Sequence, residues 1–302
     1  MKVLITGGVG FIGSNIAIHL KNQGYDVIVF DNLKRAKLST LEKINLYKIP
    51  IIIGDVLNTK KLRKALTDVD IVIHAAAYIS VEESIKKPTL YFKNNVVGTV
   101  NVANICLNKN IKLIYISSAA VYGNPINLPI NENHPTNPIS PYGLSKLMGE
   151  EVIKFYGKYG LKYVILRLFN VYGLGQSNTY SGVINCFIQR LKEGKPPIIY
   201  GDGLQTRDFI HVNDVAEAIK LSIEKEIENE IINIATGKPI TIRELAKLII
   251  NYSNQNLKPI FVKPRSSDIK HSYADISKAN KLLNFNPRIS LEQGLKELLQ
   301  LS

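Results

Sequence analysis

Short runs of apolar, mostly β-branched residues alternate with helical patterns along the first half of this chain. The apolar runs are KVLIT, DVIVF, IPIIIG, DIVIHAAA, KLIYISS and KYVILRLF. The helical patterns include FIGSNIAIHLKNQ after the first run, a long segment at residues 89 to 108, and a segment that begins at Pro141. Strands that are apolar along their whole length are typical of a parallel sheet with helices on both faces. The pattern therefore predicts an α/β fold built on a doubly wound parallel sheet of the Rossmann type.

The pattern changes after about residue 170. Turns marked by glycine and proline, such as GLGQ, GKPP and YGDGLQTRD, separate shorter candidates for strands and helices, among them IINIAT and TIRELAKLIINYS. We expect a first domain at residues 1–170 and a smaller α/β lobe at residues 171–302, parts of which may interleave with the first. Ligands of open α/β sheets bind beyond the carboxyl ends of the strands, so we expect the active cleft between the two lobes.

Composition narrows the class of protein. The 302 residues are 45% hydrophobic and 21% charged, which is ordinary for a globular protein. The most apolar long segment, TLYFKNNVVGTVNVANICL, contains a lysine and several asparagines, and the chain opens on a strand pattern without a signal peptide. We therefore expect a cytoplasmic protein with no membrane attachment.

The cysteines and the net charge exclude further classes. Cys106 and Cys186 each stand alone in an apolar segment, which predicts buried free thiols and no disulfide or metal site. The net charge of +13 comes from lysines spread along the chain, with no basic block interleaved with aromatic residues. We expect no nucleic-acid partner; a small anionic ligand or a lysine-rich surface explains the charge equally well.

A glycine-rich turn follows the first predicted strand. In TGGVGFIGS, Gly7, Gly10 and Gly13 stand where the strand gives way to a helix. Glycines in this position permit a tight turn and let backbone N–H groups and the helix N-terminus approach a pyrophosphate. The alternative is that they only close a strand-to-helix turn, but the strand before and the helix after favour a dinucleotide site.

Acidic residues at the next two strand ends bear on the choice of dinucleotide. Asp31 ends the second strand, where a carboxylate accepts from the adenosine ribose and repels a 2′-phosphate. This predicts NAD in preference to NADP, although Lys34 and Arg35 follow closely and could hold that phosphate. Asp55 and Val56 could meet the adenine, while Asp55 suits equally well a turn residue before a helix.

The stretch SPYGLSKL places Tyr142 and Lys146 four residues apart after a proline. If a helix starts at Pro141, the two side chains project from one face. A positive charge at about 4 Å and an effective dielectric of about 20 would favour the phenolate by roughly 4 kcal/mol, about three pKa units. Tyr142 is thus a candidate general base. A bare Y-x-x-x-K more often holds an apolar tyrosine and a solvated lysine, so the pair depends on its context.

Six motifs supply this context: TGGVGFIG, HAAA at 74–77, SSAAVYG at 117–123, YGLSK at 142–146, RLFNVYG at 167–173 and QTRDFIHVNDV at 205–215. In this order the chain resembles the extended short-chain dehydrogenase/reductase family, in particular its NAD-dependent sugar epimerase/dehydratase branch, typified by UDP-glucose 4-epimerase. The resemblance runs from residue 1 to about residue 290. It implies that NAD is the cofactor and a UDP-sugar the substrate.

The resemblance also implies roles for individual residues. Ser118, Tyr142 and Lys146 would form the catalytic set, with Lys146 also bonding the nicotinamide ribose. Besides the three glycines, Tyr142 and Lys146, the residues implied to line the cofactor are Phe11, Ile12, Asp31, Asn32, Asp55, Val56, Ala75, Ala76, Ala77, Asn95 and Phe169. Those implied to hold the nucleotide sugar, in addition to Ser118 and Tyr142, are Asn170, Tyr200, Arg207, Arg265 and Asp268.

Three details of the sequence bear on the residue roles that the resemblance implies. A lone arginine often makes only a surface salt bridge, and PRSSD has Ser267 where the family usually has a glycine, which weakens the assignment of Arg265. In the resembled epimerases a residue a few positions further walls the sugar pocket near C2. Counting along the match puts Ser272 there, and a serine would leave room for an N-acetyl group; the alternative is that Tyr273 turns inward instead.

The resemblance also guides the choice of reaction. Dehydratases of the branch carry Asp-Glu after the active-site threonine and the decarboxylases carry a Glu, whereas this chain has Ala119 and Ala120. Because alanine cannot move a proton, we expect C4 epimerisation through a transient 4-keto sugar. The alternatives are an enzyme that releases a keto sugar and a non-enzymatic dinucleotide-binding protein. The family's pairing of two helices across a two-fold axis predicts a homodimer through residues 89–108 and the helix after Pro141.

Overall fold

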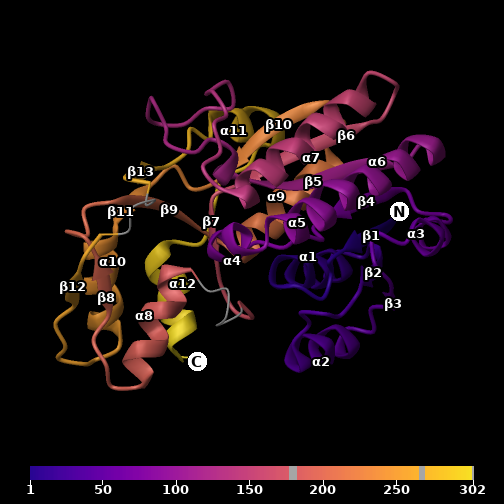
Figure 1. Cartoon of the computed structure of the whole chain (residues 1–302). Helices are drawn as coiled ribbons and strands as arrows, with labels where there is room; N and C mark the ends of the chain where they lie inside the picture. The colour runs from indigo at the N-terminus through magenta and orange to yellow at the C-terminus, as the bar shows by residue number, and fades with distance from the viewer. Residues whose placement is uncertain (177–181, 265–268, 301–302) are drawn as a thin grey trace.

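The large sheet is parallel throughout and follows the strand order β10-β6-β5-β4-β1-β2-β3 (Figure 1). The structure, a computed structural model, describes residues 1–176, 182–264 and 269–300. In that part of the chain the sheet comprises β1 (Lys2–Thr6), β2 (Asp26–Asp31), β3 (Ile51–Ile53), β4 (Ile71–His74), β5 (Lys112–Ser118), β6 (Tyr163–Leu168) and β10 (Glu230–Ile234). The predicted doubly wound α/β fold is confirmed.

Helices cover both faces of this sheet. One face packs against α1 (Phe11–Asn22), α2 (Leu38–Leu46), α9 (Val212–Glu224) and α11 (Ser277–Leu283), and the other against α3 (Thr59–Ala65), α6 (Gly98–Lys109) and α7 (Pro141–Gly157). Val3, Leu4 and Ile5 on β1 have no exposed surface. Central strands buried on both faces need apolar residues at every position, which explains the uninterrupted apolar runs.

The helical segment predicted for residues 89 to 108 is present but not uniform. It runs through α5 (Pro88–Tyr91), a π-helical stretch at Phe92–Val97, and α6, and the short α4 (Val81–Lys86) precedes it. A π-helical stretch has one residue more per turn than an α-helix and is frequent at functional sites. Here it brings Asn94 and Asn95 into the interior.

A second lobe, at the left of Figure 1, holds the smaller sheets. One joins β7 (Asn170–Tyr172), β9 (Thr206–His211), β11 (Pro239–Thr241) and β13 (His271–Ser272), and the other joins β8 (Ile198–Tyr200) to β12 (Ile260–Val262). The helices α8 (Val183–Lys192), α10 (Ile242–Tyr252) and α12 (Leu291–Gln300) pack around a separate apolar core.

The chain crosses between the two bodies more than once. After β9 it returns to the large sheet, where α9 packs against α1 and β10 pairs with β6. Segments on both sides of residue 170 therefore build the large sheet and its helical cover. The division into domains at residues 1–170 and 171–302 stays a prediction.

The prediction that both cysteines are buried is wrong for one of them. Cys106 is buried on α6, but Cys186 on α8 is exposed. The buried positions of α8 are Ile184, Phe187, Ile188 and Leu191, which follow the spacing of one helix face, and residue 186 lies off that face. An apolar-looking run does not say which of its members face inward.

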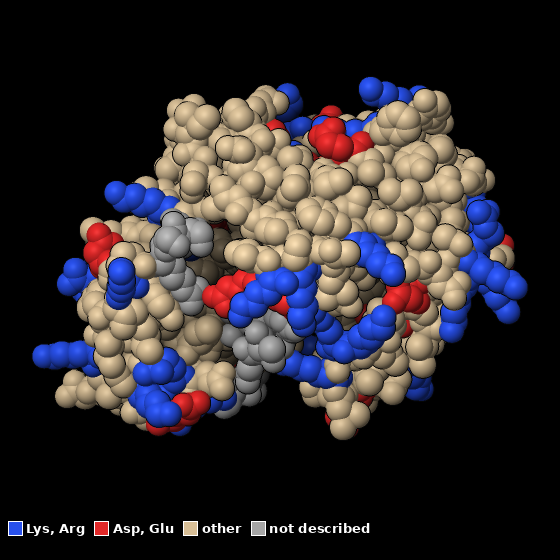
Figure 2. Space-filling view, in the orientation of Figure 1, with Lys and Arg blue, Asp and Glu red and all other residues tan. Residues whose placement is uncertain are grey.

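The described ranges and the molecular surface bear on which membranes, metals or charged partners this chain could bind. No helix there is long and apolar enough to cross a membrane. Across residues 1–176, 182–264 and 269–300, no three His, Cys, Asp or Glu side chains gather as a metal ion would require. In Figure 2, Lys and Arg side chains form separate groups, and the group across the middle has acidic side chains at both ends. The positive charge is thus divided among groups on this face.

Candidate active site

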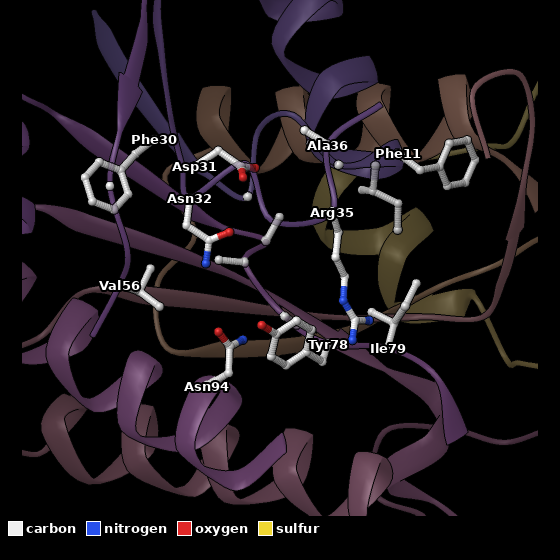
Figure 3. A pocket seen from close by; sticks show the side chains of 18 residues that line it. Phe11, Phe30, Asp31, Asn32, Arg35, Ala36, Val56, Tyr78, Ile79 and Asn94 are labelled. Carbon is white, nitrogen blue, oxygen red and sulfur yellow. The ribbon is translucent and has the colours of Figure 1, made fainter. Parts of the chain in front are cut away.

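A cavity of about 170 Å³ lies beyond the carboxyl ends of β1, β2 and β4 (Figure 3). Many of the predicted cofactor residues line it: Gly7, Gly10, Phe11, Ile12, Gly13, Asp31, Asn32, Val56, Ala75, Ala76 and Ala77. The sequence analysis did not assign the other lining residues to the cofactor, namely Phe30, Arg35, Ala36, Gly54, Tyr78, Ile79 and Asn94. Asp55, Asn95, Tyr142, Lys146 and Phe169 do not line this cavity.

The turn that carries Gly7, Gly10 and Gly13 has no room for a side chain at Gly13. Gly7 has a φ of +68°, and its N–H donates to the Phe30 carbonyl oxygen at 2.9 Å. A Cβ at Gly13 would lie 2.3 Å from the Gly7 carbonyl oxygen, so a side chain there would push α1 off the turn. α1 starts directly after Gly10 without a side-chain cap, so its first backbone N–H groups can donate hydrogen bonds to an anion. The turn therefore fits a dinucleotide pyrophosphate.

Asp31 lies on the cavity wall at the end of β2. Its carboxylate accepts from the backbone N–H of Leu33 at 2.8 Å and of Val9 at 3.0 Å. Burial raises the pKa of Asp31, and these two hydrogen bonds oppose the rise. The bonds fix the carboxylate next to the glycine turn. This is the place expected for a group that accepts hydrogen bonds from the ribose hydroxyls.

The two basic side chains that could have held a 2′-phosphate are engaged elsewhere. The Lys34 ammonium lies 3.2 Å from an Asp55 carboxylate oxygen, and the Arg35 guanidinium lies 2.6 Å from a Glu83 carboxylate oxygen. Asp55 also accepts from the Asn32 amide. It is not the cap of α3, because Asn58 accepts from the first turn of that helix. These pairings favour NAD over NADP.

Ser118 and Tyr142 meet as predicted. Ser118 is the last residue of β5, and its hydroxyl accepts from the Ala120 N–H at 3.2 Å. α7 begins at Pro141, where the Ser140 hydroxyl accepts from the Gly143 N–H and fixes the start of the helix. This start brings Tyr142 to the strand end, close enough to Ser118 that the serine hydroxyl lowers the tyrosine pKa.

Lys146 does not act on Tyr142 as the spacing predicted. Its ammonium donates to the Ile116 carbonyl oxygen on β5 at 2.6 Å and lies 4.7 Å from the centre of the Tyr115 ring. Burial lowers the pKa of Lys146 to about 7, and Glu150 opposes that shift. Burial also raises the pKa of Tyr142, and the nearby Ser118 hydroxyl opposes that rise. The prediction that the lysine charge lowers the tyrosine pKa is therefore wrong for this structure.

A buried ion pair lies behind this set. Arg167 on β6 and Glu150 on α7 approach to 2.6 Å with almost no exposed surface. Glu150 also accepts from the Ser117 hydroxyl at 2.5 Å, and Arg167 donates to the Tyr122 hydroxyl at 3.0 Å. The charges satisfy each other, as buried charges must. The pair ties α7 to β6, and the bond from Ser117 ties it to β5, the strand that ends in Ser118; no sequence motif indicated these contacts.

His74 and Asn95 hold the neighbouring loop. Burial lowers the pKa of His74 to about 3, so its ring is neutral, and it bonds the Thr6 and Thr99 hydroxyls at 2.7 and 3.0 Å. The Asn95 amide bonds both backbone groups of Tyr78 at 2.9 Å and the Ser145 hydroxyl at 2.9 Å. Asn95 thus supports the wall of the cavity from behind.

The predicted sugar residues come from several segments. Asn170, Arg207 and Ser272 lie on β7, β9 and β13, which are neighbours in one small sheet, and Ser272 pairs with Arg207 in register. Tyr200 is at the end of β8, on the separate two-stranded sheet, and Phe169 is buried against Tyr122. Arg265, Ser267 and Asp268 lie outside the described residues.

Asp208, which sequence reasoning did not single out, organises this sheet. Its buried carboxylate accepts from the Thr236 N–H and hydroxyl, the Gly237 N–H and, at 3.3 Å, the Ala274 N–H. Burial raises its pKa, and these bonds oppose the rise. The carboxylate therefore fixes the loop after β10 and the end of β13 beside Arg207.

Known proteins with similar sequences show which family this chain resembles. Residues 3–235 match the model of the NAD dependent epimerase/dehydratase family. A Methanocaldococcus jannaschii protein, provisionally named a UDP-glucose 4-epimerase, is 42% identical over 98% of this chain and 97% of its own.

Two solved structures share the architecture. UDP-N-acetylglucosamine 4-epimerase from Methanobrevibacter ruminantium M1, in complex with UDP-N-acetylmuramic acid, is 39% identical with a TM-score of 0.93, covering 99% of this chain and 97% of that one. UDP-glucose 4-epimerase from Thermus thermophilus, in complex with NAD, is 32% identical with a TM-score of 0.90, covering 99% and 98%.

Proposed function

Since this chain belongs to the NAD-dependent epimerase/dehydratase family and uses NAD, we propose that it inverts C4 of a UDP-hexose through a transient 4-keto sugar. UDP-glucose and UDP-galactose are the proposed pair, with the N-acetyl forms as further substrates. The observation that carries the proposal is the set of side chains at the carboxyl end of β5. Ser118 and Tyr142 lie close together there, and Ser118 lowers the pKa of Tyr142, while Ala119 and Ala120 occupy the neighbouring positions.

In the proposed reaction Tyr142 takes the proton of the C4 hydroxyl and later returns it to the 4-keto oxygen. Ser118 bonds the same oxygen and, from its place close to Tyr142, lowers the cost of forming the phenolate. Bound NAD supplies the hydride acceptor and donor. No described side chain at positions 119 and 120 can remove a further proton, so return of the hydride to the other face is the remaining outcome.

The diphosphate and the sugar are assigned to the second lobe. Arg207 suits a diphosphate because its planar guanidinium can bond two oxygens at once. Asn170, Tyr200, Arg265 and Asp268 complete the proposed set, and Ser272 would face the C2 substituent. The similar UDP-N-acetylglucosamine 4-epimerase, bound to UDP-N-acetylmuramic acid, supports an N-acetyl sugar as a further substrate of this chain.

A homodimer is part of the proposal. On α7 the side chains of Leu144, Met148 and Phe155 are 40%, 41% and 54% exposed, and Val97 before α6 is 48% exposed. α6 and α7 pack together, so these residues border one helical face. Light scattering at micromolar concentration is expected to give the mass of two chains, and a single-chain mass would contradict this part.

The test of the reaction is incubation with UDP-glucose or UDP-galactose while the products are followed by NMR, without added cofactor. We expect the two sugars to interconvert to the same mixture from either side. An oxidoreductase that releases NADH and the keto sugar would instead reduce NAD in proportion to the sugar consumed, which a parallel incubation with added NAD measures. A non-enzymatic binder would leave both sugars unchanged.

A further inference from the structure

At the edge of the cofactor cavity, an ion pair joins two segments that are distant in sequence. Arg35 belongs to the loop after β2 that also carries Asp31 and Asn32, whereas Glu83 belongs to α4, beyond the end of β4. A guanidinium nitrogen of Arg35 lies 2.6 Å from a Glu83 carboxylate oxygen. In Figure 3 the Arg35 side chain reaches from its loop toward Tyr78 and Ile79, which line the opposite wall.

The α4 side of this contact is fixed. The Ser80 hydroxyl caps α4 by accepting from the Glu83 N–H, and the Tyr91 hydroxyl donates to the Glu83 carboxylate at 3.0 Å. Hydrogen bonds from Arg35 and Tyr91 lower the pKa of Glu83 although burial acts against them. The carboxylate therefore stays ionised at neutral pH and holds its position.

Arg35 is held in a second way. Its guanidinium lies 4.0 Å from the centre of the Tyr78 ring, within the range of a cation–π interaction. The backbone of Tyr78 is in turn bonded on both sides by the Asn95 amide. With Glu83 and Tyr78 both anchored, the arginine side chain is the part that can swing away.

We propose that Arg35 and Glu83 form a clasp over bound NAD, which must open before the dinucleotide can enter or leave. Asp31 lies on one side of the cavity and Ala75, Ala76 and Ala77 on the other. A dinucleotide that extends from Asp31 along the glycine turn passes between the segments that the ion pair joins. The clasp acts on exchange of the cofactor and not on the sugar chemistry.

The clasp makes a kinetic prediction. Removing the ion pair and the ring contact speeds NADH dissociation about 3- to 10-fold, the ratio that corresponds to a loss of about 1 kcal/mol. Association is also faster, because the same barrier is removed, so the dissociation constant changes less than the dissociation rate. The pair is largely covered, so salt screens it only weakly, and a high salt concentration should speed dissociation from the wild type less than Arg35→Met does.

The test uses the purified enzyme loaded with NADH and chased with excess NAD, followed by stopped-flow fluorescence. Arg35→Met and Glu83→Gln are each expected to speed dissociation, and the double variant to go no faster than either one. Lys43→Met is the control: it removes an exposed positive charge on α2 that does not line the cavity, and is expected to stay near the wild-type rate.

Two results would overturn the clasp. If Arg35→Met weakens equilibrium binding as much as it speeds dissociation while Glu83→Gln has no effect, Arg35 contacts the dinucleotide directly. If neither variant changes the dissociation rate, the ion pair is a surface contact with no role in exchange. No sugar enters the experiment, so its outcome is independent of the proposed epimerisation.

Discussion

The cofactor side and the sugar side of this molecule are built differently. The cofactor cavity is formed by turns at the ends of adjacent strands, and much of its wall is backbone or alanine. The proposed sugar side takes its residues from β7, β8, β9 and β13, and Asp208 joins several of these segments through one carboxylate. The first depends on local chain geometry, whereas the second depends on how distant segments pack. The cofactor side should therefore respond to changes in backbone space, and the sugar side to changes in side-chain size.

The largest effect is expected at the point where the two sides meet. Tyr142→Phe removes the proton-transfer group and should lower turnover by about 10² or more, while NADH binding is retained. NMR of sugar interconversion and NADH fluorescence measure the two quantities. Tyr156→Phe on the same helix should behave as the wild type. Turnover of the Tyr142 variant within a few-fold of the wild type would remove Tyr142 from the chemistry.

The next effect tests the backbone character of the cofactor side. Gly13→Ala places a Cβ 2.3 Å from the Gly7 carbonyl oxygen, so the turn has to shift, and NADH affinity should fall by about 10-fold or more. Gly182→Ala is the control, since the nearest atom to its added Cβ is 3.7 Å away. Equal affinities of the two variants in fluorescence titration would contradict a space-limited turn.

A smaller and selective effect is expected on the sugar side. Ser272→Tyr should lower the rate with UDP-N-acetylglucosamine by about 10-fold, because overpacking costs about 1 to 3 kcal/mol, and should leave UDP-glucose turnover nearly unchanged. Ser272 is half-buried beside Arg207 in register. If the wild type does not turn over the N-acetyl sugar at all, Tyr273 becomes the residue to examine.

The last effect is on stability and not on activity, and it concerns the buried Lys146. The pKa of Lys146 is about 7 in the folded chain, below about 10.4 in an unfolded one, so between these values the unfolded state binds more protons. The free energy of unfolding therefore gains a contribution that rises with pH across this window. Lys146→Met should lack it, while Lys154→Met on the same helix should retain it. Urea unfolding from about pH 7 to about pH 9.5 measures both slopes, and equal slopes in the wild type and Lys146→Met would contradict the shift.

Local signals were enough to predict the large sheet and its glycine turn. The apolar runs became β1, β2, β3, β4, β5 and β6, and Gly7, Gly10 and Gly13 line the cavity, because strand burial and turn geometry depend on neighbouring residues. The meeting of Ser118 and Tyr142 needed the family motifs as well, since they are far apart in sequence.

Contacts between distant segments could not be predicted. The Arg35–Glu83 pair, the Asp208 carboxylate and the bond from Lys146 to the Ile116 carbonyl depend on tertiary packing. For Lys146 the four-residue spacing was correct but the electrostatic conclusion was wrong, because burial and a backbone acceptor outweighed the neighbouring phenol. Spacing says which face a side chain is on, not which partner it finds there.

The π-helical stretch at Phe92–Val97 sets the rotation of α6 relative to α5. One residue beyond the α-helical count turns everything after it by about 100° relative to everything before it. The stretch thereby sets the rotation between Tyr91, which bonds Glu83 before it, and Gly98, which packs against Val56 after it. Deleting the exposed Lys93 should therefore lower the unfolding temperature far more than Lys93→Ala, as followed by circular dichroism. The length of this segment is then under stricter constraint than its composition.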